Sequence, residues 1–137
     1  MKPDMTQIVG TKLTNTEGVI VVGMMTLCKE AHRAAAKWYL DPVTGEPVER
    51  NKGEMIALMH SELSEALEAI RKDLMDDKLP HRKGVEVELA DLLIRVADFG
   101  GKFNLDLGGA IVEKMRFNAI REDHTLEARR SVGGKAF

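Results

Sequence analysis

Apolar side chains recur three and four residues apart along four stretches of the chain, a spacing typical of helices that bury one face. The clearest stretch covers 53–75, and its apolar positions are Met55, Leu58, Met59, Leu63, Ala66, Leu67, Ile70 and Leu74. The other stretches cover 16–39, 85–103 and 107–121, and no segment shows a convincing strand-like alternation. The pattern predicts an all-α fold of four main helices arranged as a bundle.

Polar residues at the ends of these stretches predict where the helices begin and end. Thr14 and Glu17 have the spacing of a capping box, and Asp106 is placed to cap the fourth helix. Residues 40–52 contain two prolines and a glycine and predict a loop, as do the breaks at 76–84. We expect one domain over residues 1–137, with an N-terminal arm at 1–14 and a polar C-terminal tail at 122–137.

Composition narrows the class of protein. Apolar residues make up 44% of the chain, charged residues 31%, and the net charge is −2. These values favour a soluble cytoplasmic protein, with no membrane association and no stable binding to nucleic acid. Cys28 is the single cysteine, so no intramolecular disulfide can form, and we expect it in the core.

Four carboxylates stand in two matched pairs on the second and third predicted helices. Glu62 and Glu65 form one pair, Glu88 and Asp91 the other, and each pair has i,i+3 spacing. Residues three apart share a helix face, and the short polar turn at 76–84 favours antiparallel neighbours. The two pairs can then meet at one seam, where they repel each other unless a cation lies between them. We therefore predict a divalent-cation site there.

Each acidic pair also has an ordinary interpretation as a solvated helix face. On the third helix, this alternative pairs Asp91 with Arg95 and Asp98 with Lys102 at i,i+4 spacing. The combined pattern on two helices favours the metal site. No histidine stands at ligand spacing with the acids, so an oxygen-only site suits Mg²⁺, for which Mn²⁺ can substitute.

Cations bound by acids commonly serve phosphate chemistry, which also needs positive side chains. Lys114, Asn118 and Arg121 are spaced four and three apart on the fourth helix and are candidate contacts for phosphate or sugar. A plain solvated face is the alternative. On the first helix, His32, Lys37 and Trp38 are candidate substrate contacts, and Trp38 could stack on a base or anchor the core or an interface instead.

Residues 25–124 resemble the MazG-like nucleoside triphosphate pyrophosphohydrolases of the all-α NTP pyrophosphatase superfamily, phage-type stand-alone members included. The resemblance is carried by E-x-x-E and E-x-x-D separated by 22 residues, within HSELSEALEAIRKD and GVEVELADLLIRVADF, and by K-x-x-x-N within EKMRFNAIRED. It implies Mg²⁺-dependent hydrolysis of (deoxy)nucleoside triphosphates between the α- and β-phosphates, giving monophosphate and pyrophosphate and controlling the nucleotide pool. It also implies a homo-oligomer, either dimer or tetramer. The metal-binding and catalytic residues that it implies are Glu62, Glu65, Glu88 and Asp91, with Lys114 and Asn118 on the substrate.

Other functions stay open at this point. A pyrimidine-specific hydrolase of dUTP or dCTP belongs to the same superfamily, and neither the base nor the sugar follows from the sequence. A non-catalytic helical oligomer could use the acidic seam for a structural metal or for partner docking. A DNA-binding role is poorly supported, because Arg129, Arg130 and Lys135 make only a small basic group.

Overall fold

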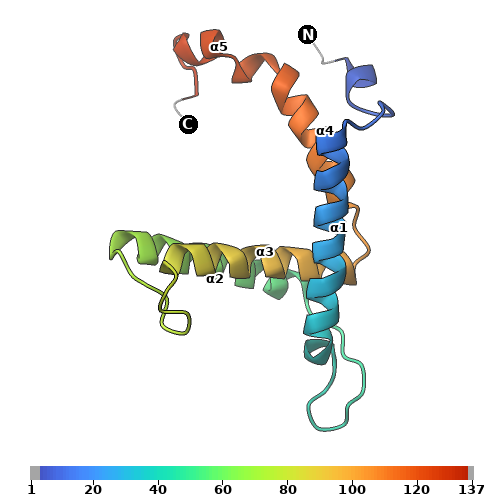
Figure 1. Ribbon diagram of the computed structural model, residues 1–137, viewed down its shortest axis with the longest axis vertical. Coiled ribbons are helices and arrows are strands. Elements are labelled where there is room, and N and C mark those ends of the chain that lie inside the picture. The colour runs from blue at the N-terminus through green and yellow to red at the C-terminus, as the bar shows by residue number, and fades with distance from the viewer. Residues whose placement is uncertain (1–3, 136–137) are drawn as a thin grey trace. The chain divides into compact units, whose positions relative to one another are not determined.

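The computed structural model describes residues 4–135, and its regular structure there is helical apart from two isolated β-bridges. The predicted all-α class with four main helices is confirmed (Figure 1). The main helices are α1 (Asn15–Ala35), α2 (Lys52–Arg71), α3 (Gly84–Lys102) and α4 (Leu107–Ile120). The shorter ones are η1 (Met5–Gln7), η2 (Ala36–Tyr39), η3 (Glu122–His124) and α5 (Leu126–Arg130).

The chain divides into two compact units. One contains the N-terminal arm up to Met24 and resumes at Asp106, so it holds the start of α1 together with α4, η3 and α5. The other runs from Met25 to Leu105 and holds the rest of α1 with η2, α2 and α3. The second unit contains the predicted acidic seam.

In the first unit, the predicted capping box opens α1. Glu17 donates its backbone N–H to Thr14 Oγ1 at 3.1 Å, and Thr14 returns its N–H to Glu17 Oε2 at 2.9 Å. Arg116 of α4 also holds the Glu17 carboxylate, with Nη2 at 2.7 Å from Oε2. This guanidinium lowers the pKa of Glu17 to about 2. Within the predicted C-terminal tail, residues 122–135 include the short helices η3 and α5, the latter capped by Thr125 Oγ1.

Helix α2 ends at Arg71, four residues before the predicted end at Met75. The chain leaves the helix at Asp73, whose φ of 49° is left-handed, and the Leu74 N–H returns to the Ala69 carbonyl at 3.0 Å. This arrangement is a Schellman-type helix end. The Leu74 carbonyl then accepts the N–H of Gly84 at 2.9 Å, which ties the end of α2 to the start of α3.

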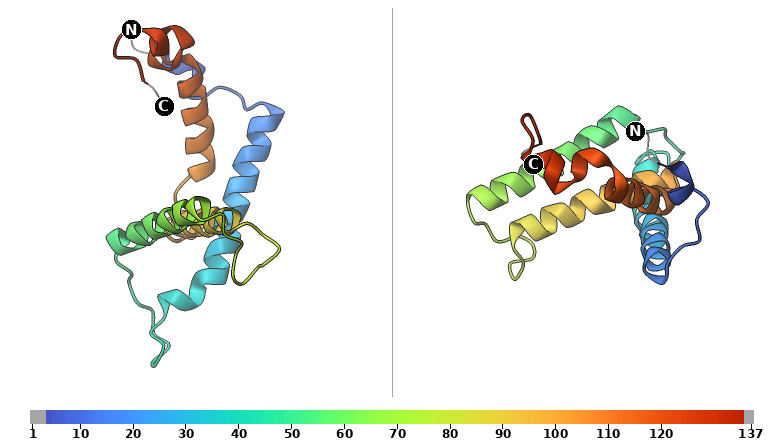
Figure 2. Two further views of the ribbon diagram at one scale, coloured as in Figure 1. Left: turned by 90° about the vertical axis from the view of Figure 1, so that its left-hand side faces the viewer. Right: turned by 90° about the horizontal axis from the view of Figure 1, so that it is seen from above.

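Helices α2 and α3 pack side by side as an antiparallel hairpin, as the predicted short connection requires (Figures 1 and 2). Several of the buried positions on these two helices are small, among them Ala66 and Ala69 on α2 and Ala97 on α3. At the start of α3, a Cβ on Gly84 would lie 3.0 Å from the Ala69 Cβ. Small side chains therefore let the two backbones approach closely, which brings polar residues at the seam into mutual contact.

The end of α1 crosses α3 at Gly101. A Cβ there would lie 2.5 Å from the Cys28 carbonyl oxygen and 2.7 Å from the His32 Cβ, so only glycine fits. Cys28 is buried at this crossing, which confirms its predicted place in the core, and burial raises the pKa of its thiol. The crossing sets His32 of α1 against the last turns of α3.

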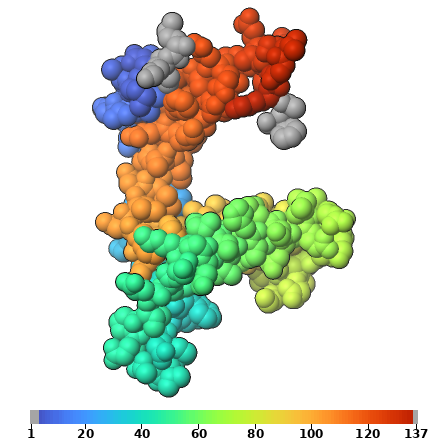
Figure 3. All heavy atoms as spheres, turned by 180° about the vertical axis from the view of Figure 1, so that it is seen from behind, coloured from blue at the N-terminus to red at the C-terminus, as the bar shows by residue number. Residues whose placement is uncertain are grey.

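The outer faces of the α2–α3 hairpin carry large apolar side chains in contact with solvent. Figure 3 shows α2 from behind as an outer surface of its unit. The apolar residues exposed on the hairpin include Leu63, Leu67, Ile70, Leu93 and Ile94. None of the helices within residues 4–135 combines the length and apolar character needed to cross a membrane.

Candidate metal centre

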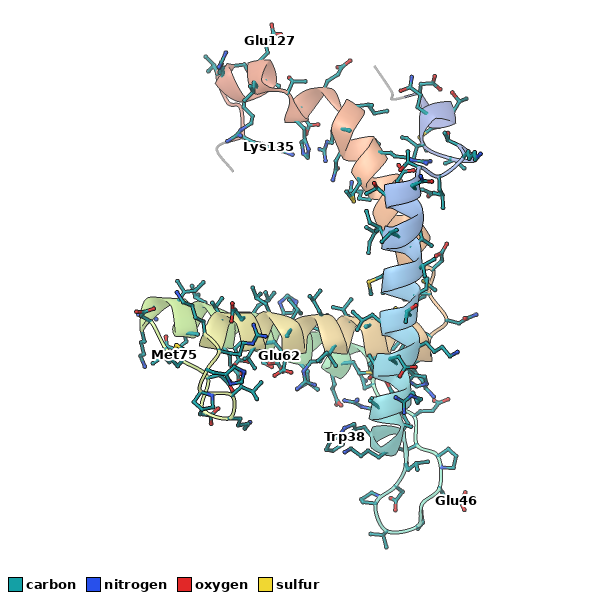
Figure 4. The ribbon with its side chains drawn as sticks, in the orientation of Figure 1. Trp38, Glu46, Glu62, Met75, Glu127 and Lys135 are labelled. Carbon is teal, nitrogen blue, oxygen red and sulfur yellow. The ribbon has the colours of Figure 1, made fainter. Side chains whose placement is uncertain are left out.

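Three of the four predicted metal ligands meet at the α2–α3 seam. Glu62 and Glu65 from α2 and Glu88 from α3 each offer a carboxylate oxygen, and these oxygens all lie within 4.8 Å of one another. Figure 4 labels Glu62 on this hairpin. The i,i+3 spacing places the first two on one face of α2, and the close antiparallel packing brings Glu88 opposite them. We call these three side chains the carboxylate cluster.

Burial differs across the carboxylate cluster. Glu62 is only 6% exposed, Glu88 is half-buried and Glu65 is exposed. A buried carboxylate is costly unless it is paired, and Glu62 is paired with Arg95 of α3, whose Nε lies 2.6 Å from Oε1. The guanidinium thus offsets one charge of three. The opening toward solvent lies on the side of Glu65.

Burial, together with the negative charge gathered around it, raises the pKa of Glu88 to about 7. Its burial is the largest cause, and the neighbouring carboxylates of Glu65 and Glu62 add to it. In the chain without a cation, Glu88 therefore keeps its proton to near neutral pH. A divalent ion would replace that proton and relieve the repulsion.

We predict that the free energy of unfolding of the EDTA-treated chain falls as the pH rises from about 4.5 to about 7. Glu88 titrates near 7 when folded, against 4.5 for an ordinary glutamate, so the folded chain binds more protons than the unfolded chain across this window. The stabilisation from the Glu88 proton is fully present below pH 4.5 and is lost as the pH rises past 7. Urea unfolding at a series of pH values measures it, and Glu88→Gln should flatten the decline.

Glu86→Gln is the matched control, because Glu86 is exposed on the same helix and lies 3.9 Å from Arg82 Nη1. Its pH profile should match that of the parent chain. A Glu88→Gln profile as steep as the parent's would contradict the prediction.

Asp91, the fourth predicted ligand, lies beside the carboxylate cluster rather than within its three-residue group. It is exposed and lines two cavities, of about 420 and 380 Å³. The i,i+4 ion pairs of the ordinary interpretation are not formed on α3 among the described residues, because Arg95 pairs with Glu62 of α2 instead of Asp91, whereas Asp91 is exposed as that interpretation expects. Asp98 likewise binds residues of α1 and η2 rather than Lys102.

The larger cavity adjoins the carboxylate cluster through Arg95. Its walls come from the end of α1, η2, the following loop, α2 and α3, and they are formed by Ala35, Trp38, Arg50, Leu58, Asp91, Ile94, Arg95 and Asp98. Trp38, labelled in Figure 4, is 64% exposed, so its ring is free on one side. Lys37 lies over that ring, with Nζ 5.6 Å from the ring centroid. An aromatic face, two guanidiniums and apolar walls suit a ligand with an aromatic and an anionic part.

Asp98 lines this cavity and is itself buried. Its Oδ1 lies 2.9 Å from His32 Nδ1, and its Oδ2 accepts the Tyr39 hydroxyl at 2.8 Å. Burial and the Asp98 carboxylate raise the pKa of Tyr39 above its ordinary value. Lys102 and Arg50 lie over the Tyr39 ring, at 4.7 and 5.6 Å from its centroid. His32, predicted as a substrate contact, is bound to Asp98 and is not among the described residues that line this cavity.

The predicted contacts on α4 belong to the first unit. Lys114 Nζ and the Arg121 guanidinium lie over the Phe117 ring, at 4.6 and 5.5 Å. Arg121 also pairs with Asp123, Nε to Oδ1 at 2.6 Å, which lowers the pKa of Asp123. The Asn118 Oδ1 is buried and has no hydrogen-bond partner within residues 4–135. The role of these three residues at the carboxylate cluster stays a prediction.

The donor set fits a hard divalent cation. Three carboxylates converge from two helices, the pKa of Glu88 is raised by burial and by its acidic neighbours, and a single guanidinium offsets their charge. Oxygen-only donors of this kind suit Mg²⁺ or Mn²⁺ better than Zn²⁺. The carboxylate cluster can therefore hold a metal ion.

Sequence reasoning did not single out Arg50, Tyr39 or Arg95 as site residues. Arg95 carried a usable signal, because it lies on the same narrow polar strip of α3 as Glu88 and Asp91. Arg50 comes from a loop without periodicity, and Tyr39 from a turn of 3₁₀-helix. Neither position carries a spacing that predicts its neighbours.

Comparison of the chain with models of protein families found no match, and comparisons with curated proteins and with solved structures found no significant similarity. The resemblance to the MazG-like enzymes accordingly rests on the motifs themselves.

Proposed function

We propose that this protein is a Mg²⁺-dependent nucleoside triphosphate pyrophosphohydrolase of the MazG-like type. The observation that carries the proposal is the carboxylate cluster: three acidic side chains from the two motifs lie with their oxygens within 4.8 Å of one another. Such an arrangement is unfavourable without a cation and well suited to holding one. Nucleotide-pool control is the role that follows from this activity.

The adjoining cavity supports a nucleotide as the substrate. Trp38 offers a face for stacking on a base, and Arg50 and Arg95 offer planar cations that match phosphate oxygens. The volume of about 420 Å³ lies in the range of small-ligand sites. Lys114 and Asn118, which belong to the first unit, remain candidate substrate contacts on the strength of the sequence motif alone.

The reaction that we propose is attack of water on the α-phosphorus. A new P–O bond forms to the water oxygen, the bond from the α-phosphorus to the α–β bridging oxygen breaks, and pyrophosphate leaves with that electron pair. A bound divalent cation supplies charge neutralisation at the phosphate oxygens and makes nearby water more acidic. Glu62, Glu65 and Glu88 hold the site, Asp91 stands at its edge, and one carboxylate accepts the proton of the water.

The homo-oligomer is part of the proposal. The α2–α3 hairpin leaves Leu67 and Ile70 of α2 and Leu93 of α3 exposed, and exposed large apolar side chains favour burial against a partner. A second copy of this chain is the partner that the family resemblance implies, as a dimer or a tetramer.

The test is a panel of the common ribo- and deoxyribonucleoside triphosphates, each incubated with Mg²⁺, with Mn²⁺ or with EDTA. We expect monophosphate and pyrophosphate as the products, activity with both metals and none with EDTA. A preference for dUTP or dCTP would identify the pyrimidine-specific alternative. Release of inorganic phosphate with a diphosphate product would overturn the proposal. Metal binding without turnover of any nucleotide would favour the non-catalytic helical oligomer.

A further inference from the structure

Arg95 takes an unexpected partner. Asp91 stands one turn earlier on the same helix and is exposed, yet Arg95 reaches across the seam to Glu62, Nε to Oε1 at 2.6 Å. The reason is burial. Glu62 is 6% exposed, so an unpaired charge on Glu62 costs far more free energy than an unpaired charge on the exposed Asp91. Arg95 therefore occupies the acidic seam as an internal cation.

A divalent ion held by the carboxylate cluster would compete with this guanidinium. Glu62 belongs to both the ion pair and the cluster, so the metal and the Arg95 charge would lie next to each other and repel. Once the metal neutralises Glu62, the guanidinium is no longer needed there. The ion pair and the metal are thus alternatives for the same carboxylate.

Arg95 has room to move. Its side chain is 40% exposed and lines the cavity of about 420 Å³ that also contains Arg50 and Trp38. Asp98, in the same wall, has both oxygens engaged by His32 and Tyr39, so it does not compete strongly for the guanidinium. A released Arg95 would add its charge to that of Arg50 in a cavity that adjoins the metal ligands.

We propose that Arg95 is an exchangeable counter-ion, which neutralises Glu62 in the metal-free chain and, when a divalent cation binds, turns into the adjoining cavity to bind phosphate oxygens together with Arg50. This inference rests on the proposed function for the identity of the ligand. It makes metal and nucleoside triphosphate bind cooperatively, because the metal frees the cation that the triphosphate needs. The same coupling disfavours triphosphate binding before the metal.

The experiment compares the parent chain, Arg95→Gln and a control, Arg33→Gln, which removes an exposed arginine paired with Glu30 at 2.6 Å. Titration calorimetry with Mn²⁺ alone should give Arg95→Gln about tenfold tighter metal binding, because no guanidinium has to be displaced. The control should match the parent. Equal or weaker Mn²⁺ binding by Arg95→Gln would overturn the inference.

Trp38, the chain's one tryptophan, lines the cavity and reports on its occupancy by fluorescence. With saturating Mg²⁺, an α,β-methylene nucleoside triphosphate, which cannot be cleaved at that position, should bind Arg95→Gln about tenfold more weakly than the parent. Unchanged affinity would overturn the movement of Arg95 into the cavity.

Folding of the variant is checked separately. Removing Arg95 leaves Glu62 buried without a partner, so the metal-free variant should melt at a lower temperature and gain more from Mn²⁺ than the parent does. Arg95→Lys keeps a charge without the planar donors and should fall between the two. If these binding results hold while no nucleotide is hydrolysed, the proposed hydrolysis fails and the counter-ion exchange stands. If nucleotides are hydrolysed but Arg95→Gln does not change metal binding, the proposed hydrolysis stands and the counter-ion exchange fails.

Discussion

Glu65→Gln should lower the rate of nucleoside triphosphate hydrolysis at least about a hundredfold while leaving the helices intact. Glu65 is the most exposed member of the carboxylate cluster and stands where its opening meets solvent. An amide keeps the shape of the side chain and removes the charge that holds a cation, so about 3 kcal/mol or more of transition-state stabilisation is lost. Steady-state rates with saturating Mg²⁺ and circular dichroism measure the two effects.

Glu68→Gln is the matched control, because Glu68 lies one turn further along α2 and is held by Lys72, Nζ to Oε1 at 2.5 Å, outside the carboxylate cluster. It should keep the parent's rate. In EDTA, Glu65→Gln should unfold at a slightly higher temperature than the parent, since one repelling charge is gone. An active Glu65→Gln enzyme would remove the basis for the metal centre.

The meeting of Glu62, Glu65 and Glu88 could be predicted because two periodicities and one connection length determine it. Helical spacing places each pair on one face, and the short turn between α2 and α3 makes the helices antiparallel neighbours. The spacing does not determine how far each helix is rotated about its own axis at the seam. A modest rotation of α3 is enough to bring Glu88 to α2 and leave Asp91 at the edge of a cavity.

The partners of Arg95 and Asp98 could not be predicted for a related reason. Helical spacing relates only residues on the same helix, and it therefore predicted ion pairs of Asp91 with Arg95 and of Asp98 with Lys102. The fold prefers the partners that relieve the greater burial cost: Arg95 goes to Glu62, and Asp98 to His32 and Tyr39. The contact between Asp98 and His32 depends on Gly101, where α1 crosses α3 without a side chain in between. Such a crossing leaves no periodic trace in the sequence.

Asp98→Ala should lower the free energy of unfolding by about 3 kcal/mol. We expect no other replacement of a single acidic residue in this chain to destabilise it more. Asp98 is 6% exposed and joins α3 to His32 of α1 and to Tyr39 of η2. Its removal leaves the Tyr39 hydroxyl, which is itself buried, without an acceptor. Urea unfolding in EDTA measures the loss without any contribution from metal.

Two comparisons separate this loss from a general sensitivity of α3. Asp91→Ala lies two turns earlier and is exposed, so it should change stability by only tenths of a kcal/mol even though we expect it to impair hydrolysis. Tyr39→Phe removes the hydroxyl that Asp98→Ala would strand, so the double variant should be destabilised by less than the sum of the two single variants. Full additivity, or an Asp98→Ala chain as stable as the parent, would show that this buried carboxylate does not hold the wall of the cavity in place.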